Sequence, residues 1–151
     1  MSNKFENAFN AGITSAKQAE EAIKEIDNVF ETLNNAIQTS SKGQIEIKRK
    51  QLTYTNKGLL GLSLDPFSVP RLYWAITANN PTLTGGMTKE LATWDMDPKG
   101  YPCQICWDDN EVFCDDKIAL ENCLADLLQD ATIGRRLYAL MNLENQPEKT
   151  E

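Results

Sequence analysis

The chain has 151 residues, of which 41% are hydrophobic and 25% are charged, a composition typical of a folded domain and not of a disordered chain. Its 22 acidic and 15 basic residues give a net charge of −7, which argues against general binding to nucleic-acid phosphates and favours partners with basic surfaces. It contains no histidine, which excludes Ser-His-Asp and Cys-His catalysis within one chain and the zinc sites that need imidazole.

Length and hydropathy predict one α+β domain over residues 1–143, followed by a disordered acidic tail over 144–151. No stretch approaches the roughly 20 apolar residues that span a bilayer, and the first residues lack the pattern of a signal peptide. We therefore expect a cytoplasmic protein with no membrane contact, and we expect neither a cofactor nor a bound metal.

A long helix is predicted over residues 5–39, because small and apolar residues recur at alternating spacings of three and four. These residues are Gly12, Ala16, Ala19, Ile23, Ile26, Phe30, Leu33 and Ile37. A helix of about 34 residues is about 51 Å long, whereas a globule of this chain length is roughly 38 Å across. At least two turns should overhang the body.

The overhanging part is predicted to be the half with small residues, Gly12, Ala16 and Ala19, which permits close approach of another helix. We expect it to form a homodimer or to bind a partner. The alternative is a shorter or kinked helix that packs wholly within one monomer.

Strands are predicted after this helix. Residues 44–55 read as a strand with a bulge near Arg49 or Lys50, because the apolar residues change phase there. Residues 59–64 read as the second arm of a hairpin, and residues 72–78 as a buried strand.

The last strands should form a meander: a hairpin of residues 89–96 and 101–107, then a short strand over 111–114. Asp115 or Asp116 is predicted to cap a helix, and a last short helix is expected over 135–142. The fold is thus predicted as a long helix on an antiparallel sheet of about five strands, closed by one or two C-terminal helices.

Four cysteines are candidates for a zinc site or a redox pair: Cys103, Cys106, Cys114 and Cys123. Spacing of three on a strand would point Cys103 and Cys106 to opposite faces, and Cys123 lies inside a predicted helix. Buried or half-buried reduced thiols are therefore the favoured interpretation.

A candidate partner-binding site combines acidic and aromatic residues: Trp94, Trp107, Asp108, Asp109 and Glu111. The acidic run reads either as a solvated turn with a helix cap or as a docking patch for a basic protein. Trp94 and Trp107 lie on or beside the central hairpin, so that one of them could stand on an exposed sheet face beside the acidic turn.

The leading hypothesis is a non-enzymatic intracellular binding protein of the inhibitor, immunity or adaptor type. One alternative is a small acidic secretion or assembly chaperone that dimerises through the helix and holds an extended client on the sheet. The other is a divalent-metal-dependent nuclease that uses Glu46 and Lys48, with Asp27 or Asp65 as further candidate ligands.

Overall fold

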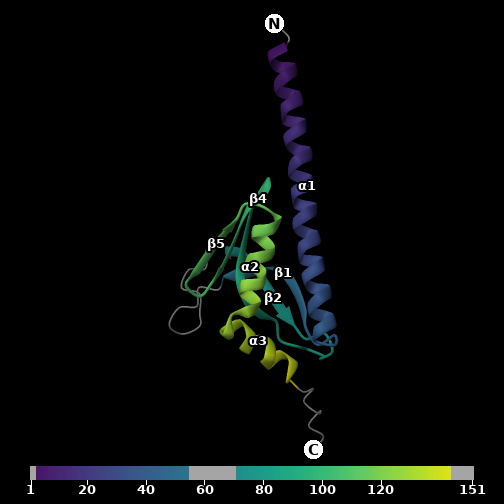
Figure 1. Cartoon of the computed structure of the whole chain (residues 1–151), viewed down its shortest axis with the longest axis vertical. Coiled ribbons are helices and arrows are strands. Elements are labelled where there is room, and N and C mark those ends of the chain that lie inside the picture. The colour runs from purple at the N-terminus through teal and green to yellow at the C-terminus, as the bar shows by residue number, and fades with distance from the viewer. Residues whose placement is uncertain (1–2, 55–70, 144–151) are drawn as a thin grey trace, which may run out of the picture.

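The structure is a computed structural model that describes residues 3–54 and 71–143 of the chain. In these residues it contains three helices and five strands (Figure 1). The elements are α1 (Asn3–Ser40), β1 (Glu46–Tyr54), β2 (Arg71–Asn79), β3 (Lys89–Asp97), β4 (Gly100–Trp107), β5 (Asn110–Cys114), α2 (Lys117–Gln129) and α3 (Ala131–Met141). The predicted strand over 59–64 and the predicted tail over 144–151 lie outside the described residues.

The long N-terminal helix is confirmed as one unbroken element of 38 residues. It ends where Lys42 and Gly43 adopt positive φ angles of 55° and 79°. The Gly43 amide then donates to the Gln38 carbonyl over 2.7 Å, which satisfies a carbonyl of the last turn. Its core-facing residues Ile26, Val29 and Phe30 are buried.

The five strands form an antiparallel sheet in the order β1-β2-β3-β4-β5. The bulge that we predicted near Arg49 or Lys50 is wrong, because β1 and β2 pair continuously from Glu46 with Asn79 to Tyr54 with Arg71. The apparent change of phase arises because the core-facing position after Ile47 is held by Arg49. Irregular pairing lies instead between Ile76 and Thr77 and at the end of β3.

Two aspartates begin the C-terminal helices. The carboxylate of Asp116 accepts the Ala119 amide at the start of α2 over 2.8 Å. Asp130 accepts the amides of Thr132 and Ile133 at the start of α3. Because Asp130 supplies this cap, α3 begins at Ala131, four residues before the predicted start at residue 135.

The core lies between the sheet and the three helices, which pack on it (Figure 1). Buried side chains come from α1, from all five strands and from both C-terminal helices; among them are Ile26, Ile76, Ile105, Leu120 and Ile133. The β3–β4 turn meets α1 closely: a Cβ added at Gly100 would lie 2.8 Å from the Ala22 Cβ. The body thus begins to contact α1 close to Ala22.

The first half of α1 projects beyond the body (Figure 1), as the length comparison predicted. Residues 3–18 are all exposed, and Ala19 is the first partly buried residue of the helix. No helix among the described residues is long and apolar enough to cross a membrane.

Candidate protein-binding groove

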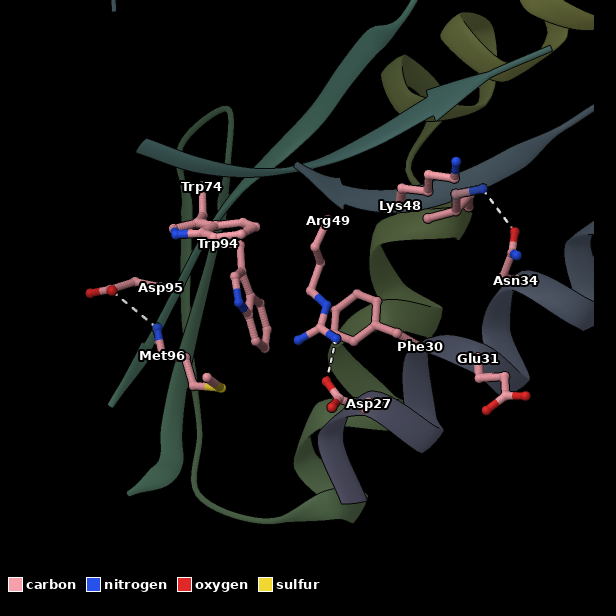
Figure 2. Close-up of a pocket in the computed structure, with 11 residues that line it drawn as sticks. Asp27, Phe30, Glu31, Asn34, Lys48, Arg49, Trp74, Trp94, Asp95 and Met96 are labelled. Atoms are coloured by element: carbon pink, nitrogen blue, oxygen red, sulfur yellow. Dashed lines mark hydrogen bonds and ion pairs between the residues drawn. The ribbon is translucent and has the colours of Figure 1, made fainter. Parts of the chain in front are cut away.

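An open groove of about 700 Å³ runs between α1 and the sheet. Helix α1 contributes Asp27, Phe30, Glu31 and Asn34, and the strands contribute Ile47, Lys48, Arg49, Trp74, Trp94, Asp95 and Met96 (Figure 2). The groove therefore joins side chains from the second half of α1 with side chains from the first three strands.

Arg49 organises the floor of the groove. Its guanidinium carbon lies 4.3 Å from the centre of the Phe30 ring and 5.4 Å from that of Trp94, and its Nη2 donates to the Asp27 Oδ1 over 2.6 Å (Figure 2). Phe30 and Trp94 meet edge to face, with ring centres 5.0 Å apart. The two aromatic rings and the Asp27 carboxylate stabilise the positive charge of Arg49, which occupies a core-facing position of β1 where the strand pattern would place an apolar residue.

The rim of the groove carries more negative than unpaired positive charge. Asp27, Glu31 and Asp95 are exposed acids that line it. Its basic side chains are both paired, Arg49 with Asp27 and Lys48 with Glu46 over 3.0 Å. A cation that enters the groove therefore meets the carboxylates of Glu31 and Asp95, since that of Asp27 is already paired with Arg49.

Trp74 stands at the edge of the groove with 49% of its surface exposed. It also borders a second hollow of about 570 Å³, together with Tyr54, Leu72, Tyr73 and Glu90. Tyr54 and Tyr73 meet edge to face at 6.5 Å, and a hydrogen bond to Glu90 raises the pKa of Tyr73. The side chains of Leu72 and Trp74 lie on one face of the sheet, and those of Tyr54, Tyr73 and Asp95 lie on the other. We call the set that surrounds this exposed end of the strands, Tyr54, Leu72, Tyr73, Trp74, Glu90 and Asp95, the acidic aromatic surface.

Such a surface suits a basic side chain better than a neutral one. A tryptophan face attracts a cation placed over it, and nearby carboxylates add to the attraction. The exposed Leu72 lies two residues before Trp74 on the same face of β2 and offers apolar contact beside it. The arrangement can hold the aliphatic stem and charged head of Lys or Arg together.

The two tryptophans that we predicted for partner binding are both buried, which corrects the expectation that one stands exposed beside the acidic turn. Trp94 is 6% exposed beneath Phe30 and Arg49, and Trp107 is 8% exposed. The Trp107 indole nitrogen has no hydrogen-bond partner within the described part of the chain. The exposed tryptophan is Trp74, which the sequence analysis placed in a buried strand.

Asp108, Asp109 and Glu111 are exposed at the turn between β4 and β5. Asp108 has a φ of 50°, and Glu111 accepts a hydrogen bond from Gln104. This turn lies at the end of β4 opposite Gly100, which packs on α1, and it does not line the groove. The structure therefore does not bring the predicted acidic residues together with Trp94.

Cys103, Cys114 and Cys123 lie buried together on the core side of the sheet, and Cys106 is half-buried on the other face. Burial raises the pKa of Cys103 and of Cys123 to about 12, so both thiols are neutral at physiological pH. Over residues 3–54 and 71–143, no group of three or more His, Cys, Asp or Glu residues is placed to hold a metal ion.

Of the residues named for a nuclease, Glu46 and Lys48 lie together, but Asp27 does not join them. Glu46 pairs with Lys48, while Asp27 pairs with Arg49 across the groove. Asp65 lies outside the described residues.

The three predicted helix-contact residues, Gly12, Ala16 and Ala19, lie on or beside the projecting half of α1. A Cβ added at Gly12 would meet nothing within 4 Å. The sequence analysis missed the larger apolar groups on this segment: Phe5, Phe9 and Ile13 are 79%, 67% and 43% exposed. Their spacing of four extends the same helical pattern toward the N-terminus and could have shown them.

Comparison with protein-family models, with curated protein sequences and with solved structures finds no match for this chain.

Proposed function

We propose that this chain is a non-enzymatic binding protein that holds a basic segment of a partner protein on its acidic aromatic surface. The observation that carries the proposal is the half-exposed Trp74 ring, which stands between two hollows lined by acidic residues. A large aromatic side chain in such a position is typical of the residues that dominate binding energy in protein interfaces.

Electrostatics support a basic partner over an acidic one. Glu31, Glu90 and Asp95 line the two hollows in addition to the Asp27–Arg49 pair, and the whole chain carries a net charge of −7. Such a field increases the rate at which a positively charged partner meets the surface, and added salt weakens this effect. The exposed turn with Asp108, Asp109 and Glu111 adds to the field without belonging to the contact.

A displayed library of short random peptides tests the proposal without knowledge of the natural partner. Selection on the wild-type chain should enrich peptides that contain Lys or Arg next to an apolar residue. Trp74→Ala should weaken the selected peptides by about 30-fold, which corresponds to about 2 kcal/mol for an aromatic anchor. Asp95→Lys should weaken them too and should reduce the salt dependence of the association rate.

Tyr138→Ala provides the matched control, because Tyr138 is 69% exposed on α3 and lines neither hollow. This variant should bind the selected peptides as the wild type does. Enrichment of acidic peptides, or equal binding by Trp74→Ala and the wild type, would contradict the proposal.

A further inference from the structure

The projecting segment of α1 has no support from the described part of the body. Residues 3–18 are exposed on all sides, and an isolated helix of this length is only marginally stable in water. Yet it displays Phe5 and Phe9 at 79% and 67% exposure. Two such side chains four residues apart form an exposed apolar stripe, and exposed apolar patches of this kind mark interaction sites.

The stripe continues the core-facing side of α1. Phe5, Phe9, Gly12, Ala16 and Ala19 follow one another at spacings of four, three, four and three. The same spacing leads through Ile23 to Ile26 and Phe30, which are buried against the sheet. The stripe therefore lies on the side of the helix that carries the body, beyond the end of the body near Ala22 (Figure 1).

We infer that the covering surface is the same segment of a second copy of this chain, packed antiparallel. A parallel copy is excluded by sterics, because each body occupies the stripe side of its own helix from about Ala22 onward. In a parallel pair both bodies would need the space between the two helices. In an antiparallel pair the bodies lie at opposite ends and leave that space free.

The sizes of the side chains along the stripe favour one register. If Gly12 lies opposite Gly12 of the second copy, Asn3 of each copy lies opposite Glu21 of the other, just short of Ala22, where the body begins. The overlap then uses the whole projecting segment. In the same register Phe5 lies opposite Ala19 and Phe9 lies close to Ala16, so that each large side chain meets a small one.

The area is sufficient for a specific interface. An aromatic side chain buries roughly 200 Å², so that covering Phe5 and Phe9 in both copies removes about 600 Å² from water at their observed exposures. Ile13, the alanines and the aliphatic stems of flanking side chains need to add only about 200 Å² per copy to pass the roughly 1,000 Å² that marks a specific interface.

Sedimentation equilibrium of the full chain at micromolar concentration tests this inference. The wild type should be a dimer. Phe9→Asp places a charge at the centre of each half of the contact and should raise the dimer dissociation constant about 100-fold or more. Ile118→Asp is the matched control, because Ile118 is 69% exposed on α2, and it should remain dimeric. A monomeric wild type, or an unchanged dimer of Phe9→Asp, overturns the inference.

Disulfide crosslinking tests the orientation. In a Cys106→Ser background, Phe5→Cys and Ala19→Cys should each fail to crosslink alone, because the antiparallel register separates like positions by about 20 Å along the helix. A mixture of the two variants should form the crosslinked heterodimer. Crosslinking of Phe5→Cys with itself would show a parallel pair and overturn the register.

The dimer and the acidic aromatic surface are independent, since the residues of one do not line the other.

Discussion

Arg49 illustrates how a single residue can mislead a pattern and yet order a site. Its charge at a core-facing position of β1 interrupts the alternation of Ile45 and Ile47, which is why the sequence predicted a bulge. The structure stacks its guanidinium on Phe30 and Trp94 and pairs it with Asp27. Such compensation depends on α1, whose contact with this strand cannot be inferred from local sequence.

The buried thiols predict a loss of stability in alkaline solution. In the unfolded chain a thiol ionises near pH 8.5, whereas burial raises the pKa of Cys103 and Cys123 in the folded chain to about 12. Because the folded pKa is raised, the stabilisation is complete below about pH 8 and is lost as pH rises toward 12. The free energy of unfolding should fall by about 1.4 kcal/mol per pH unit for each thiol in that window.

Urea denaturation at several pH values between about 8 and 11 measures this slope. Tyr101 adds to it at the upper end, since burial and a hydrogen bond to Glu25 raise the pKa of its phenol as well. Cys123→Ala should reduce the slope by the share of one thiol. An equal slope in Cys123→Ala and the wild type would contradict the assignment.

Elements were predicted well where the signal is local. The helical seam of α1 and the hairpin of residues 89–96 and 101–107 depend on neighbouring residues, and both are confirmed. The start of α3 was predicted too late, at residue 135, because the sequence analysis did not identify Asp130 as the cap of this helix. The groove could not be predicted, since it requires the register that places Trp74 beside Trp94 and the packing of α1 across both.

The contact between the β3–β4 turn and α1 should tolerate no side chain at Gly100. Gly100 has a φ of 97°, and an added Cβ would lie 2.8 Å from the Ala22 Cβ. Gly100→Ala should therefore lower the free energy of unfolding by about 2 kcal/mol or more. Gly134→Ala, at an open helical position, should instead raise it by about 0.5 to 1 kcal/mol. Urea denaturation measures the free energy of unfolding of both variants. Similar changes in the two would contradict close packing of Gly100 against α1.

Tertiary contacts are distributed unevenly over the whole molecule. Strands β1 to β5 and the C-terminal helices share one core, while residues 3–18 contact none of it. The sequence predicted this imbalance because helix length and globule size follow from general geometry. It also predicted the side of α1 that faces the sheet, since Ile26 and Phe30 of the seam are buried, but it did not show where along the helix the body begins.

Limited proteolysis should measure how readily the projecting segment of α1 unfolds. Lys17 is exposed in the projecting segment of α1, and a protease cuts a helix only after local unfolding. In the proposed dimer, trypsin should cleave at Lys17 slowly, whereas Phe9→Asp should be cleaved there at least about 10-fold faster because its segment frays. Equal cleavage rates in the two proteins would indicate that the segment gains no protection from a second copy.

The unbroken course of α1 has a mechanical consequence. With 38 residues and no Pro or kink, it acts as a rigid spacer and not as a tether. In the antiparallel register the two bodies begin about 30 Å apart, each carrying one acidic aromatic surface. Such a pair is bivalent: a partner with two basic segments at matching separation would be held by both surfaces, with an avidity well above the affinity of either.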